Sequence, residues 1–180
     1  MRELFEIHLP KRFIVGTVGD LDDRDFFIQA KDDARLVTIS LEAGQCDVLA
    51  QGLDRILDEL IKMGINVPIA DPGDLDLEPL NKPIEVEFDA QSMGLAWNEM
   101  TELITLEIHG PGESQDIPDV EENPLDGPPC LRVRLSLDQA RAFVARTNRI
   151  LAFGAKPCQF CQMPIEPRGH ICPRANGYRR

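Results

Sequence analysis

The spacing of apolar residues changes along this chain from a strand pattern to a helix pattern, and this restricts its fold more than any other feature. Apolar residues first alternate with a period of two, which is typical of strands, in residues 3–9, 13–18, 25–30 and 35–41. From Cys46 to Met63 they recur with helical spacing, and Gly64 follows where a helix cap is expected. The predicted buried face consists of Val48, Leu49, Leu53, Ile56, Leu57, Leu60 and Ile61. We expect a four-strand antiparallel meander closed by one amphipathic helix.

The second part of the chain repeats this order of elements. Strand-like alternation returns in residues 84–88, 94–97, 103–108 and 131–135. Ser136-Leu-Asp-Gln139 is then a capping box, which predicts a helix that runs to about Phe153 and stops at Gly154. The sequence therefore predicts an α+β fold with two strand-rich halves, each an antiparallel meander followed by one amphipathic helix.

A local sequence echo between the two parts favours an internal duplication. Val37-Thr-Ile-Ser-Leu41 precedes Arg55-Ile-Leu57 much as Val133-Arg-Leu-Ser-Leu137 precedes Arg149-Ile-Leu151, although ordinary strand-to-helix junctions also produce such matches. We expect one domain over residues 1–154, with halves at about 1–64 and 83–154. The second half contains a segment of different composition, residues 110–129, with five prolines, six acidic residues and no basic residue. We expect this segment to be an exposed and partly disordered loop.

Charge and hydropathy exclude several classes of protein. The formal net charge of −12 on 180 residues argues against binding of nucleic acid through the bulk charge, since phosphate contacts need clustered Lys and Arg. The first residues lack the long apolar run of a signal peptide, and no run approaches the length of a membrane helix. Five cysteines without a secretion signal indicate a reducing compartment. We expect a cytoplasmic protein without a membrane partner.

The C-terminal segment contains the motif with the most definite chemistry, Cys158-x2-Cys161-x8-His170-x-Cys172. A Cys-x2-Cys turn places two sulfurs on one metal ion, and a second ligand pair completes the tetrahedron that Zn2+ prefers. The spacing therefore predicts a zinc-knuckle tail over residues 155–180, with Cys158, Cys161, His170 and Cys172 as ligands. The single residue between His170 and Cys172 is shorter than in most second knuckles.

Two other roles of these cysteines stay open. Cys158 and Cys161 could form a redox pair, although they do not sit at the strand-to-helix junction of a thioredoxin-like unit. The stretch Pro157-Cys-x-x-Cys161 also matches half of the nucleobase-deaminase signature, but the His-x-Glu half is absent. Because four ligands would close the coordination sphere, a structural ion is favoured over a catalytic one.

Two further cysteines, Cys46 and Cys130, lie far from the motif in sequence. Cys46 stands near a helix start, where the helix dipole could activate a thiol. A small buried hydrophobic side chain is the favoured interpretation of both.

The tail sequence, from Cys158-Gln-Phe-Cys161 through His170-Ile-Cys172 to Tyr178, resembles a bacterial family known as domain of unknown function 3090. The opening resembles it as well, at Phe5, Pro10, Arg12-Phe13 and Gly16-Thr17-Val18-Gly19. The family is mainly actinobacterial, and the resemblance implies a protein partner, either histidine-phosphatase-like or kinase-like, in a phosphate-handling system. It implies no activity, so the zinc ligands are assigned on their chemistry alone.

These observations lead to three hypotheses of function. The first is a non-enzymatic, zinc-containing binding or adaptor protein that works with phosphate-handling enzymes. The alternative is a metal-dependent hydrolase that acts on a phosphorylated metabolite. A weaker alternative is an RNA-contacting module that uses the basic tail, with Arg174, Arg179 and Arg180.

Overall fold

The protein contains eight strands and two helices within the residues that its computed structural model describes, which are 3–69, 71, 75–112, 119–123, 126–153, 158–162, 165 and 172–174. The elements are, in chain order, β1 (Leu4–His8), β2 (Arg12–Asp20), β3 (Asp23–Lys31), β4 (Leu36–Leu41), α1 (Ala43–Lys62), β5 (Val86–Asp89), β6 (Ser92–Asn98), β7 (Leu103–His109), β8 (Cys130–Leu135) and α2 (Leu137–Ala152). The predicted α+β class is confirmed, and each predicted strand is present within a few residues of its expected limits.

The end of α1 and the start of α2 each have the cap that the local sequence predicts. At the end of α1, Gly64 has a φ of 86°, and the amides of Gly64 and Ile65 donate to the carbonyls of Ile61 and Leu60. This closes the helix with a Schellman motif, in which the left-handed position favours glycine. At the start of α2, the Ser136 hydroxyl accepts from the amide of Gln139, at 3.2 Å, in the predicted capping box.

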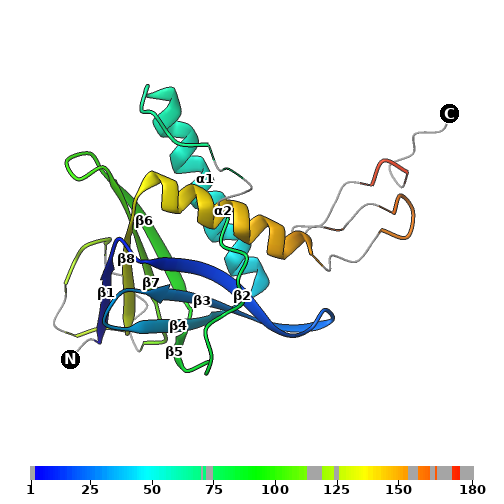
Figure 1. The fold of residues 1–180 in the computed structure, drawn as a ribbon, viewed down its shortest axis with the longest axis horizontal. Coiled ribbons are helices and arrows are strands. Elements are labelled where there is room, and N and C mark those ends of the chain that lie inside the picture. The colour runs from blue at the N-terminus through cyan, green and yellow to red at the C-terminus, as the bar shows by residue number, and fades with distance from the viewer. Residues whose placement is uncertain are drawn as a thin grey trace.

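The strands form two sheets of four, and each sheet contains one strand from the other part of the chain. One sheet has the order β2-β3-β4-β5 and the other the order β1-β8-β7-β6. Three strands in each sheet are antiparallel neighbours, whereas β5 lies parallel to β4 and β1 lies parallel to β8. The two sheets thus have the same plan and exchange their edge strands, as Figure 1 shows for β1 (dark blue) beside β8.

This exchange removes the first strand from each predicted meander, since β1 pairs with β8 and β5 pairs with β4. The sequence places residues 3–9 with the next three strands, but β1 leaves them and pairs with β8 from Leu4↔Cys130 to His8↔Arg134. The parallel pairing of β1 with β8 joins residues that are far apart in the sequence, and the alternation of apolar residues does not specify such a partner. The duplication itself stays a prediction.

A glutamine in the first turn of each helix holds the chain that leaves an exchanged strand. The side-chain oxygen of Gln45 accepts from the backbone amide of Glu42, and its Nε2 donates to the carbonyl of Ala90, just after β5. Gln139 does the same in α2, where Oε1 accepts from Ser136 and Nε2 donates to Pro10, just after β1. The contact at Glu42 also explains why α1 begins at Ala43, three residues before the predicted start.

One continuous apolar core joins both sheets and both helices. α1 packs against α2, and α2 packs against β2 (Figure 1). Two residues that the sequence places on the buried face of α1 are in fact exposed, Val48 by 63% and Ile61 by 48%, because they flank the strip that faces the core. Asp47, predicted on the polar face, is only 6% exposed and accepts a hydrogen bond from Gln51.

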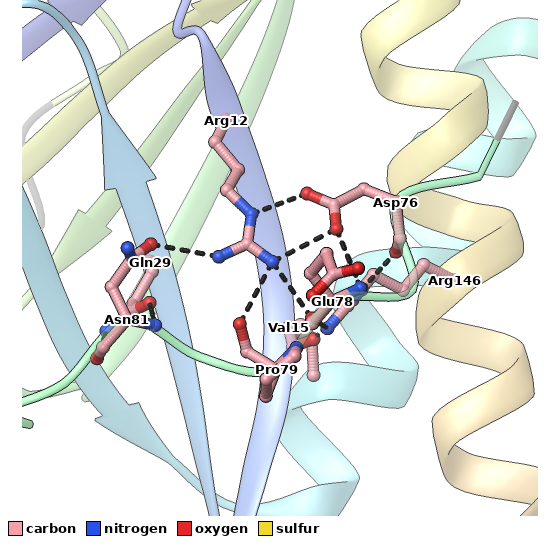
Figure 2. A network of polar contacts seen from close by, with 8 residues as sticks. All are labelled: Arg12, Val15, Gln29, Asp76, Glu78, Pro79, Asn81 and Arg146. Carbon is pink, nitrogen blue, oxygen red and sulfur yellow. Dashed lines mark hydrogen bonds and ion pairs between the residues drawn. The ribbon is translucent and has the colours of Figure 1, made fainter.

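Two arginines fasten the segment of residues 75–81 across the molecule (Figure 2). Arg12 of β2 donates to the Asp76 carboxylate, to Asn81 and to the carbonyls of Glu78 and Pro79. Arg146 of α2 donates to the backbone carbonyls of Val15, Asp76 and Glu78, and its Nη1 atom also forms an ion pair with the Asp76 carboxylate at 3.6 Å. The Arg12 hydrogen bond holds the pKa of Asp76 below its usual range, and burial lowers the pKa of Arg146.

We expect Arg146→Ala to lower the free energy of unfolding by about 3 kcal/mol, because it leaves the buried carbonyl of Val15 without its side-chain donor. Urea denaturation measures this change. The control is Arg141→Ala in the same helix, whose partner Asp54 is half exposed, and we expect it to cost less than about 1 kcal/mol. Equal losses in the two variants would contradict the role given to Arg146.

We also expect Asp76 to contribute to the pH dependence of stability. Its pKa is lower in the folded protein, so its contribution is full above the unfolded-state pKa and is lost as the pH falls through the folded-state pKa. Asp76→Asn should reduce stability at neutral pH and flatten its decline in acid, as measured by thermal denaturation across pH. Asp33→Asn, which removes an exposed carboxylate paired with Lys11, should leave the profile unchanged.

Candidate metal centre

The tail brings three cysteine side chains to one point. The sulfurs of Cys158, Cys161 and Cys172 all lie within 4.8 Å of one another, and Cys158 and Cys172 are buried. The turn after Cys158 is closed by the amide of Gln162, which donates to the Cys158 carbonyl at 2.9 Å with Gln162 in the left-handed region at a φ of 62°. The amide of Phe160 points at the Cys158 sulfur, at 3.5 Å. Amides that donate to sulfur favour the thiolate form, which is the form that binds metal.

The distances between these sulfurs fit one metal ion. The sulfurs of Cys158 and Cys172 are 3.7 Å apart. A tetrahedron with metal–sulfur bonds of about 2.3 Å has edges of about 3.8 Å. Three converging sulfurs also exceed what a two-cysteine redox pair requires. The three cysteines could therefore hold a metal ion, while the fourth predicted ligand, His170, lies outside the described residues.

A hydrogen bond from a side chain joins residues 158–162 to residues 172–174, in addition to the contact between the cysteine sulfurs. The Nη1 atom of Arg174 donates to the carbonyl of Phe160, at 3.1 Å. This places Arg174, predicted as a contact to RNA in the weaker alternative, against the cysteine turn. The other two arginines of that hypothesis, Arg179 and Arg180, lie outside the described residues.

The two cysteines outside the tail are both buried, as the sequence predicts, but their surroundings differ. Cys46 lies in the apolar core at the start of α1, where burial raises the pKa of its thiol to about 12. This excludes the activation by the helix dipole that its position near a helix start suggested. Cys130 begins β8 on the opposite face of its sheet from the core, beside ionisable side chains.

A second group of ligand-type side chains surrounds Cys130, and the sequence did not reveal it. Glu107, His109 and Cys130 are fully buried, and one ligand atom of each lies within 4.8 Å of the others. Glu107 also pairs with the buried Arg132, whose Nε lies 2.5 Å from Oε1. The available signal was the period-two pattern of polar residues in β7 and β8, which ordinarily indicates a solvated face.

Two hollows in the surface of the described residues differ in charge, since one is acidic and the other is basic. The first, of about 560 Å³, includes the carboxylates of Asp25, Glu42 and Asp89 among its walls. The second, of about 280 Å³, is lined by Thr17, Arg24, Leu77, Arg146, Arg149, Ile150 and Phe153. The basic hollow lies beside the end of α2, whose residues Arg146, Arg149 and Ile150 form part of its wall.

Neither helix within the described part of the chain has the length and apolar character that a membrane crossing requires. Comparison with curated proteins and with solved structures found no match. A family model does match, over residues 5–172, and its description reads "Protein of unknown function (DUF3090)". The match covers the first predicted strand, both helices and the tail through Cys172. The chain therefore belongs to this family, as its opening and its cysteine motif indicate.

Proposed function

We propose that this chain is a non-enzymatic, zinc-containing binding protein whose tail is ordered by Zn2+. The observation that carries the proposal is the convergence of three cysteine sulfurs, with one pair separated by the edge length of a zinc–thiolate tetrahedron. His170 would complete a set of three thiolates and one imidazole, which is typical of structural zinc sites. A closed set leaves no coordination position for a substrate, which favours binding over catalysis.

The binding surface that we propose is the basic hollow beside α2. Arg24 and Arg149 line this hollow, and Phe153, which is 69% exposed, forms part of its wall. Positive charge at one place on a chain with a net charge of −12 would select an acidic region of a partner. An exposed aromatic side chain beside arginine is the composition found at energetic centres of protein interfaces.

The partner that we propose is a phosphate-handling enzyme, either histidine-phosphatase-like or kinase-like. The resemblance of the opening and of the tail to this family suggested such a partner, and the basic hollow is a surface that suits it. The zinc-ordered tail would present Phe160, which is 61% exposed, as a second point of contact. No contact within the described residues favours the hydrolase or RNA alternatives over this proposal, and both stay predictions.

We expect Cys161→Ser to remove about one zinc per chain relative to the unchanged protein, because it takes one thiolate from the site. Mass spectrometry of metal content in protein purified without chelator measures this, and far-UV circular dichroism should show the two sheets and two helices intact. The control is Cys46→Ala, which removes a buried core thiol and should leave the zinc content unchanged. Equal zinc contents in the Cys161 variant and the unchanged protein would refute the tail site.

We expect Arg149→Glu with Phe153→Asp to abolish co-purification of a histidine-phosphatase-like or kinase-like partner from the native host. Reversal of charge and loss of the aromatic side chain should weaken such a complex at least tenfold. Met100→Asp is a matched control, because Met100 is 95% exposed in the β6–β7 turn, and it should leave the complex intact. A partner retained equally by both variants would place the interface elsewhere.

A further inference from the structure

Glu107, His109, Cys130 and Arg132 form a buried polar group on the face of the β1-β8-β7-β6 sheet that points away from the core. This group contains more than the salt bridge between Glu107 and Arg132. Glu107 Oε1 is saturated, since it accepts from Arg132 Nε at 2.5 Å and from the backbone amide of Glu121 at 2.9 Å. The other oxygen, Oε2, is buried and has no hydrogen-bond donor among the described residues. A buried carboxylate oxygen without a donor costs free energy unless a cation or a proton compensates it.

The unsatisfied oxygen faces two ligand-type atoms. His109 Nε2 lies 3.2 Å from Glu107 Oε2, which is an ion pair when the imidazole is protonated, but the geometry does not make a hydrogen bond. The Cys130 sulfur completes the group within 4.8 Å. Two ligands with bonds of about 2.1 Å to a tetrahedral ion stand about 3.4 Å apart, so the separation of Oε2 and Nε2 matches one edge of such a site. The three atoms therefore surround one position at which each of them can bind the same ion.

We propose that Glu107 Oε2, His109 Nε2 and Cys130 Sγ bind a second divalent transition-metal ion, of which Zn2+ is the representative. Carboxylate, imidazole and thiolate together suit a borderline ion and not Ca2+ or Mg2+, which take oxygen ligands. On binding, Cys130 loses its thiol proton to solvent, His109 binds as neutral imidazole and Glu107 as carboxylate. Arg132 keeps its pair with Oε1 and so orients the carboxylate, as groups that hydrogen-bond to metal ligands do.

The equivalent place in the other sheet shows that the fold does not need these residues. There the antiparallel pair Gln29↔Thr38 takes the position of Glu107↔Arg132, next to Lys31↔Leu36 in place of His109↔Cys130. Gln29 is buried, but it is neutral: its Nε2 donates to the Thr38 hydroxyl and to the Asn81 carbonyl, and its Oε1 accepts from the Asn81 amide. One sheet therefore buries a satisfied amide where the other buries charges and metal-ligand atoms.

The connection between the paired strands differs in the same way. β3 and β4 are joined by the short turn of residues 32–35, whereas β7 and β8 are joined by residues 110–129. Within the described part of that loop, Glu121 accepts from Thr105 and Asn123 accepts from Arg132. The segment of residues 121–123 therefore lies over the polar face, although its side chains are exposed. A metal ion beneath it would exchange slowly with solvent.

The test starts from a chain without the tail site, Cys158→Ser, Cys161→Ser and Cys172→Ser. After loading with Zn2+ and desalting, we expect this variant to retain about one ion per chain. Adding Cys130→Ser should lower the affinity for Zn2+ at least tenfold, whereas adding Cys46→Ala should not change it. With Co2+ as the probe, the thiolate-to-cobalt absorption should be present in the tail variant, retained with Cys46→Ala and lost with Cys130→Ser. Loss of that band reports a lost ligand and not a change of stability.

A tail variant that is folded by circular dichroism and binds neither ion would overturn the second site, as would cobalt absorption that survives Cys130→Ser. Release of zinc from the protein with its tail site intact, followed with a chelator, gives an independent measurement. Two phases are expected, with the slower one abolished by His109→Gln, and release kinetics that His109→Gln leaves unchanged overturn the proposal. Failure of the tail site alone would appear differently, as a zinc content that Cys161→Ser leaves unchanged.

Discussion

The exchange of edge strands between the two sheets is the constraint on which the rest of the structure depends. Because β1 completes the sheet of β6, β7 and β8, and β5 completes the sheet of β2, β3 and β4, neither sheet is whole without the other part of the chain. The two helices then cover a single core, and their first-turn glutamines hold the segments that leave the exchanged strands. Arg12 and Arg146 fasten the connecting segment of residues 75–81 over this junction.

Local chemistry made most of the elements predictable, and long-range contacts made the rest unpredictable. Helical spacing, the capping box at Ser136 and the glycine at Gly64 each act within a few residues, so the helices could be placed from sequence. The partner of β1 could not, because alternation specifies which face of a strand is buried and not which strand lies beside it. The echo of Val37–Leu41 in Val133–Leu137 also does not match the positions of the elements. It is shifted by two residues relative to the helix starts after Glu42 and Ser136.

The two groups of metal-ligand atoms differ in how much of each the sequence could reveal. The tail cysteines are close in sequence, so their spacing alone predicted that the sulfurs of Cys158, Cys161 and Cys172 would meet. Glu107, His109 and Cys130 come together only through strand pairing and the covering loop. A strand with polar residues on one face is ordinarily predicted to expose that face to solvent. The sequence does not show that a segment covers this face, so the group could not be predicted.

The parallel pairing of Leu4 with Cys130 has a consequence for the order in which the protein can fold as it is made. β1 is made well before its partner β8, so it must wait while the elements between them are synthesised. Until then β8 is absent, and an edge that is buried in the finished protein stays open to other chains. The sheet of β1, β8, β7 and β6 is therefore completed only when β8 has been made and pairs with β1, and topologies that rely on such distant pairs fold slowly.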